Sequence, residues 1–136
     1  MLIKSQNDLR RLLEEARVIA VVGHSDRPNR TSYRIANYLR RAGYKVYAVN
    51  PSIQQVNGEP AYPNLAAVPE PIDIVDVFRR SEFLGEVVDQ AIAAAAKSVW
   101  AQLGVYDEAA AARAEAAGLQ MVMDRCIMVD HERLLG

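Results

Sequence analysis

The sequence predicts an α/β fold: a doubly wound parallel sheet of five strands with helices on both of its faces. Short runs of β-branched residues alternate along the chain with helical stripes of apolar residues, which is the pattern of βαβ units. The strand-like runs are apolar at consecutive positions, as in strands that are buried on both faces. The chain has 136 residues. This length suits a single domain, which we place at residues 1–136.

The chain begins with a helix and a strand. Apolar residues recur at helical spacing over 9–16, and Ser5 with Asp8 resembles a capping box at the start of this helix. Residues 18–22 form a short β-branched run. This run is the first strand, and it ends at Gly23.

A second helix and strand follow a polar loop. Apolar positions predict the helix over 35–42, with Thr31 or Ser32 as its N-cap. Residues 45–49 are the second strand. The proline-rich stretch 52–71 is longer than an ordinary connecting loop, and we expect it to pack over a functional edge of the sheet.

The second half of the chain repeats the alternation. We expect a short helical turn near Leu65 within the proline-rich stretch. Beyond it the predicted elements are strands at 74–78, 98–103 and 119–123, helices at 84–95 and 107–117, and a short C-terminal helix.

The loop after the first strand has the composition of a phosphate cradle. In an open α/β sheet the ligand binds beyond the carboxyl ends of the strands. Gly23 permits a tight turn there, and the free N–H groups of the next helix attract an anion. The loop and first helical turn also supply hydroxyl and guanidinium groups: Ser25, Arg27, Arg30, Thr31, Ser32 and Arg34. The alternative is an ordinary βα loop with solvated arginines.

Two familiar nucleotide-binding motifs are missing. The sequence has no G-x-x-x-x-G-K-[ST] and no G-x-G-x-x-G, because Gly23 stands alone in its loop. The second strand ends in Asn50-Pro51, without the acidic residue that holds an NAD ribose. We therefore expect a phosphorylated ligand other than a nicotinamide cofactor.

Five segments together resemble the bacterial CoA-binding protein family, which is similar to the N-terminal CoA-binding domain of the succinyl-CoA synthetase alpha subunit. The segments are 21–25, 43–46, 49–51, 73–80 and 99–104. The resemblance implies a Rossmann-like fold and coenzyme A or acyl-CoA as the ligand. It implies no catalysis by this chain, because the synthetase carries its phosphorylated histidine in a further domain.

The resemblance also assigns roles to residues. It implies that Gly23, His24 and Ser25 hold the pyrophosphate. It places Asn50 and Pro51 beside the adenosine, with Val77 and Phe78 packed on the nucleotide. Where the synthetase-type domain has a lysine, this chain has Ile53. The nearest replacements for phosphate recognition are Arg27, Arg79 and Arg80.

Two other functions stay open at this stage. A small hydrolase or transferase acting on a nucleotide-like substrate would use His24 and Asp26 as acid and base. A structural or regulatory subunit that has lost its ligand is the third possibility. His131 is interpreted as a solvated helix residue, and Asp76, inside a buried strand, needs a hydrogen-bond partner.

Charge, hydropathy and cysteine content limit the kinds of ligand and partner that the chain is expected to have. The net charge of −1 gives no reason to expect nucleic acid. No apolar run approaches the ~20 residues of a membrane span. The one cysteine, Cys126, allows no internal disulfide or zinc cluster, and is interpreted as a small buried apolar residue. We expect a cytoplasmic protein that binds CoA or acyl-CoA and holds no metal. Its protein partner is expected to be a second copy of itself or an unidentified enzyme.

Overall fold

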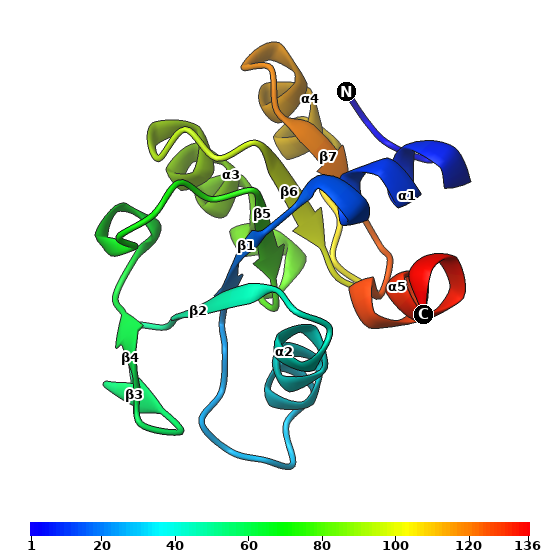
Figure 1. Cartoon of the computed structure of the whole chain (residues 1–136). Coiled ribbons are helices and arrows are strands. Elements are labelled where there is room, and N and C mark those ends of the chain that lie inside the picture. Colours follow the sequence, from blue (N-terminus) through cyan, green and yellow to red (C-terminus); the bar gives the residue numbers. More distant parts are fainter.

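The computed structural model describes all residues, 1–136, and contains one seven-stranded sheet covered by helices on both faces (Figure 1). The strands are β1 (Val18–Val22), β2 (Lys45–Val49), β3 (Gln55–Val56), β4 (Glu59–Tyr62), β5 (Ile74–Val77), β6 (Ser98–Ala101) and β7 (Gln120–Val122). The helices are α1 (Gln6–Glu15), α2 (Thr31–Arg41), α3 (Leu84–Ala93), α4 (Glu108–Ala116) and α5 (Ile127–Leu135). Short 3-10 turns lie at η1 (Leu65–Ala67) and η2 (Ser81–Phe83).

The strand order is β3-β4-β2-β1-β5-β6-β7. Every pair is parallel except β3 with β4. The predicted α/β class, the doubly wound sheet and the helical turn near Leu65 are confirmed. The predicted strand number is wrong, because the proline-rich stretch contains the hairpin β3–β4. Its turn is formed by Asn57 and Gly58, both at positive φ (52° and 83°), as a tight hairpin requires.

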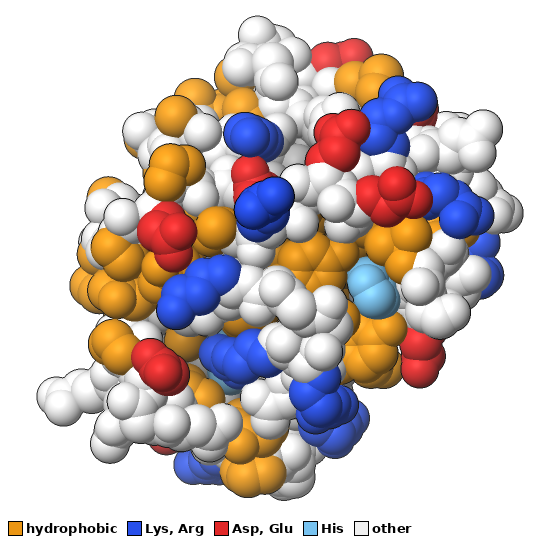
Figure 2. Space-filling view, viewed as in Figure 1, with side chains coloured by type: hydrophobic (Ala, Val, Ile, Leu, Met, Phe, Trp, Pro, Cys, Tyr) orange, Lys and Arg blue, Asp and Glu red, His pale blue; other side chains and the backbone are white.

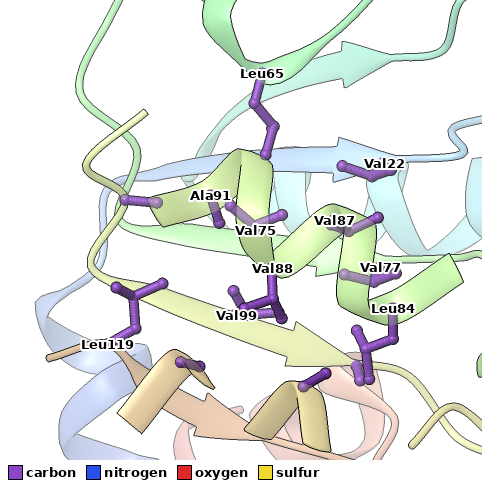
Figure 3. Packing of buried hydrophobic residues seen from close by; sticks show 14 of the residues in the cluster. Val22, Leu65, Val75, Val77, Leu84, Val87, Val88, Ala91, Val99 and Leu119 are labelled. Carbon is purple, nitrogen blue, oxygen red and sulfur yellow. The ribbon is translucent and has the colours of Figure 1, made fainter. Parts of the chain in front are cut away.

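The core has two layers, one on each face of the sheet. Helices α1, α2 and α5 cover one face, and α3 and α4 cover the other. Figure 3 shows the second layer, where α3 places Leu84, Val87 and Val88 against side chains of the central strands. β1 is buried at all five positions, as its uninterrupted apolar sequence predicts.

Two predicted helix starts have different outcomes. The Ser5 hydroxyl accepts a hydrogen bond from the N–H of Asp8 (3.2 Å), so the predicted cap of α1 is confirmed. The predicted cap of α2 is wrong. Arg30 is its N-cap residue, and no side chain caps this helix. The Ser32 hydroxyl accepts instead from the N–H of Ser25 (3.0 Å), which fixes the preceding loop.

The surface carries both charges. Figure 2 shows basic and acidic side chains interspersed over one face, with apolar side chains between them. No helix combines the length and apolar character needed to cross a bilayer.

Candidate ligand-binding site

The loops after β1, β2 and β5 meet at the carboxyl edge of the sheet. The chain adds β2 on one side of β1 and β5 on the other, so the strand order reverses at this point. β1 lies between β2 and β5, so this is the switch point at which α/β sheets bind ligands. The N–H of Gly23 donates to the carbonyl of Val49, and the N–H of Phe78 donates to that of Val22 (both 2.9 Å). These bonds tie the three loops to one another.

Three hollows surround Phe78 at this edge. The broad hollow, of about 520 Å³, is lined by Val22, Gly23, Val49, Asn50, Pro51, Ser52, Pro63, Phe78, Arg79, Arg80, Phe83, Glu86 and Gln90. The polar hollow, of about 520 Å³, is lined by Gly23, Ser25, Asp26, Asn29, Arg30, Thr31, Ser32, Asn50, Ile53 and Phe78. The apolar hollow, of about 530 Å³, is lined by Thr31, Ile35, Phe78, Arg79, Arg80, Gln102, Leu103, Gly104, Val105 and Cys126. Three residues of the proline-rich stretch, Ser52, Ile53 and Pro63, line these hollows, whereas its hairpin β3–β4 extends the sheet beside β2.

The polar hollow has free backbone donors. Because α2 lacks a side-chain cap, the N–H groups of Thr31, Ser32 and Tyr33 have no partner within the chain. Thr31 and Ser32 line the hollow together with Arg30, a cation at the positive end of the helix dipole. An uncapped helix start with a guanidinium beside it is suited to an anion such as a phosphate.

The imidazole of His24 faces the protein interior. The side chain is 0% exposed, and its Nδ1 lies 2.8 Å from the carbonyl of Ser25, to which it donates. Its Nε2 lies 3.1 Å from a guanidinium nitrogen of Arg40 and accepts from it. Burial lowers the pKa of His24 to about 4, so the ring is neutral at pH 7. Both ring nitrogens of His24 are therefore engaged inside the protein, and these bonds hold the loop in place.

This geometry predicts that acid destabilises the protein through His24. The pKa is about 4 in the folded chain and near 6.5 in the unfolded one, so the unfolded state binds the proton more readily between these values. Protonation of His24 in the unfolded chain therefore lowers the free energy of unfolding as the pH falls from 6.5 to about 4, and has no effect above pH 6.5. The free energies of unfolding by urea at pH 7.5 and 5.0 measure this loss. His24→Gln should reduce the difference between the two pH values, and an unchanged difference would contradict the assignment.

Asn50 joins the loops after β1 and β2. Its Nδ2 donates to the carbonyl of His24 (3.0 Å), and its Oδ1 accepts from the N–H of Ser52 (2.9 Å). Both side-chain ends of Asn50 are therefore engaged, and Asn50 and the exposed Pro51 form one wall of the broad hollow. The structure brings this pair to the edge, where the family resemblance places the adenosine.

The residues after β5 divide between core and surface. Val77 is wholly buried and lines none of the three hollows, so the structure places it beneath the edge. Phe78 lines all three. The Arg79 guanidinium lies 4.1 Å from the centre of the Phe83 ring, a cation–π contact. Arg80 pairs with Glu82 (3.0 Å), but both side chains are exposed, so the pair holds Arg80 weakly.

The arginines of the β1–α2 loop occupy different places. Arg30 lines the polar hollow, whereas the exposed Arg27 lines none of the three. Arg34 donates to the carbonyl of Asn29 (2.9 Å) and braces the loop. Ile53, at the position of the family lysine, also lines the polar hollow and contributes no charge there.

Several residues were missed or misread in the sequence. Arg40 lies at the end of α2 remote from the edge, and its side chain nevertheless reaches His24. The interpretation of His131 as solvated is wrong, because it is half-buried and its Nδ1 is bonded to the Tyr38 hydroxyl (2.7 Å). Phe83 was missed, although its place just after the third predicted strand was a usable signal. No three His, Cys, Asp or Glu side chains gather as a metal site would require.

The fold and the position of the hollows define a class: a doubly wound, Rossmann-like domain with an open polar hollow at its switch point. Within that class, residues 17–132 match the family described as CoA binding domain. The chain belongs to this family.

The relatives include proteins of the same size and parts of larger ones. The chain is 40% identical over 127 residues to the uncharacterized protein YneT of Bacillus subtilis, covering 93% of this chain and 94% of that one. A structure of a hypothetical protein from Pyrococcus horikoshii is 41% identical with a TM-score of 0.94, covering 98% and 94%. A dinucleotide-forming acetyl-coenzyme A synthetase of Ca. Korarchaeum cryptofilum is 28% identical with a TM-score of 0.71, covering 85% of this chain and 27% of the synthetase.

Proposed function

We propose that the protein binds coenzyme A or acyl-CoA along the carboxyl edge of its sheet and performs no chemistry on it. The family supports CoA as the ligand, and the synthetase relative shares this domain as about a quarter of its length. The observation that carries the proposal is the uncapped start of α2, whose free N–H groups line an open polar hollow beside Gly23.

The pyrophosphate would lie in the polar hollow. The N–H groups of Thr31 and Ser32 and the Arg30 guanidinium would be the donors there, and Ser25 lines the same hollow. Gly23 lets the loops after β1 and β5 approach each other closely, because an added Cβ would lie only 2.6 Å from the carbonyl oxygen of Phe78. These features fit a diphosphate, which needs several donors and close backbone approach.

The adenosine 3′-phosphate would lie in the broad hollow. Arg79 and Arg80 line it, and Phe83 offers an aromatic face beside them. Because Ile53 cannot bind phosphate, these two arginines are the replacements for the family lysine that the structure favours over Arg27.

The burial of His24 supports binding without catalysis. A hydrolase or transferase would need an imidazole that exchanges protons with a bound substrate. Both ring nitrogens are instead occupied by Ser25 and Arg40, inside the protein.

Calorimetric titration of the full chain with CoA tests the proposal directly. We expect saturable binding of one CoA per chain, together with a rise in the melting temperature. If millimolar CoA produces no heat and no thermal shift, the proposal is overturned.

The variant Arg30→Ala should weaken CoA binding about tenfold, because one charge-assisted hydrogen bond to phosphate is lost. The side chain is exposed, so the melting temperature of the free protein should change little. Arg41→Ala is the matched control: Arg41 is an exposed arginine at the other end of the same helix. Equal affinities for the two variants would remove Arg30 from the site.

A further inference from the structure

We infer that the apolar hollow takes the thioester end of an acyl-CoA, and that it favours a short uncharged acyl chain over a carboxylated one. The inference rests on the proposed function, since it assigns the far end of the same ligand. It concerns the hollow between α2, the end of β5 and the loop after β6.

The apolar hollow borders the two that would hold the nucleotide. It shares Thr31 with the polar hollow, and Arg79 and Arg80 with the broad hollow, while Phe78 lines all three. Thr31 stands at the start of α2, where the pyrophosphate would be bound. An arm leading away from that pyrophosphate past Phe78 therefore enters the apolar hollow.

The lining has the chemistry of an acyl site. Five of its ten residues are apolar: Ile35, Phe78, Leu103, Val105 and Cys126. Leu103 is 72% exposed at the rim, so a ligand chain lying there would cover apolar surface now in contact with water. The one neutral amide, Gln102, is 5% exposed and already accepts from the N–H of Ile127 (3.1 Å).

Charge at the hollow argues against a carboxylated acyl chain. No Asp or Glu lines the hollow. Its two cations, Arg79 and Arg80, also line the broad hollow, where the nucleotide phosphate would bind them. Arg79 is stacked on Phe83, while the exposed pair of Arg80 with Glu82 holds Arg80 only weakly. A carboxylate would lose its hydration on entering the hollow, whereas an uncharged chain has no charge to desolvate. The hollow therefore suits an uncharged chain better.

Affinities along a ligand series test this assignment. The full chain is titrated with 3′,5′-ADP, which lacks the pantetheine arm, and with acetyl-CoA, butyryl-CoA and succinyl-CoA. Each methylene that leaves water should tighten binding about fourfold, so butyryl-CoA, which has two more methylenes, should bind up to about fifteenfold tighter than acetyl-CoA. Tighter binding of succinyl-CoA than of butyryl-CoA would overturn the preference for an uncharged chain.

The single cysteine reports occupancy of the hollow independently. Cys126 is half-buried, lines the hollow and is the only thiol of the chain, so alkylation by N-ethylmaleimide can be followed by mass spectrometry. Saturating butyryl-CoA, which has no free thiol, should slow alkylation at least fivefold, whereas saturating 3′,5′-ADP should leave it within twofold. Equal rates with both ligands bound would overturn the inference and leave the proposed function intact. If none of the ligands binds, the proposed function itself fails.

Leu103→Ser should abolish the preference for butyryl-CoA over acetyl-CoA while the affinity for 3′,5′-ADP is unchanged. Val129→Ser is the matched control, because Val129 is also an exposed apolar residue (51%) but lies on α5 and lines none of the three hollows. A preference that persists in Leu103→Ser would exclude this rim from the acyl site.

Discussion

The variant Gly23→Ala is expected to lose about 3 kcal/mol of folding free energy and all measurable CoA binding. Gly23 has φ +87°, a conformation that costs an L-residue strain. An added Cβ would also lie 2.6 Å from the carbonyl oxygen and 3.2 Å from the carbonyl carbon of Phe78. Backbone atoms cannot rotate away, so the loops after β1 and β5 would have to separate. Urea unfolding and calorimetry with CoA measure the two effects.

Gly118→Ala separates conformational strain from the clash. Gly118 has nearly the same φ (+84°), but a Cβ there meets no heavy atom within 4 Å. It should cost only the strain of the left-handed conformation, about 1 kcal/mol, without affecting binding. Equal losses of stability in the two variants would show that contact with Phe78 does not constrain Gly23.

Replacing Asp76 by Asn should remove a loss of stability at high pH. Asp76 lies on β5 between Val21 of β1 and Trp100 of β6, is 0% exposed, and neither carboxyl oxygen has a hydrogen-bond partner. The partner expected from the sequence is therefore absent. Burial raises the pKa of Asp76 well above the ordinary 3.8, so the folded chain keeps this carboxyl protonated at pH values where the unfolded chain has released the proton.

The sign of the pH dependence follows from this difference. Above pH 3.8 the folded state binds more protons than the unfolded state, so stability decreases as the pH rises towards the folded-state pKa. Asp76→Asn should flatten this decrease in urea unfolding at pH 5 to 9. Asp76→Val, which also removes the unpaired oxygens, should add about 2 kcal/mol at pH 8. A slope that is the same in the wild type and Asp76→Asn would contradict a buried neutral carboxyl.

Asp73→Asn provides the opposite control. Although burial acts to raise its pKa, the N–H groups of Val18 and Arg17 (2.9 and 2.8 Å) and the Lys97 ammonium (3.3 Å) hold the pKa of Asp73 below 3.8. Its contribution is therefore present above pH 3.8 and lost in acid. Asp73→Asn should destabilise the protein at pH 7, whereas Asp76→Val should stabilise it.

The elements that the sequence predicted well are those with a strong local pattern. β1 and β2 have the predicted bounds, because each is a five-residue run between clear breaks. The hairpin β3–β4 was missed although Asn57-Gly58 is a strong turn signal. Its strands are short, and one contains Pro60, which obscures the alternation of apolar and polar residues.

The candidate site was predicted in position but not in the roles of its side chains. The carboxyl-edge rule placed Gly23, Asn50 and Phe78 together, and the structure does bring them together. The rule says nothing about which way a side chain turns. His24 turns inward to Arg40, and Arg27 stays away from the hollows that Arg30 lines.

The periodicity of apolar residues and the order of the elements alone determined the class of fold and the edge of the sheet at which the candidate site lies. Both depend on local pattern and on the handedness of βαβ connections, which the chain specifies without reference to distant residues. Tertiary structure decided the burial of His24, the unpaired carboxyl of Asp76 and the three neighbouring hollows around Phe78. Each arises from side chains far apart in sequence, whose contacts are set by how the layers pack.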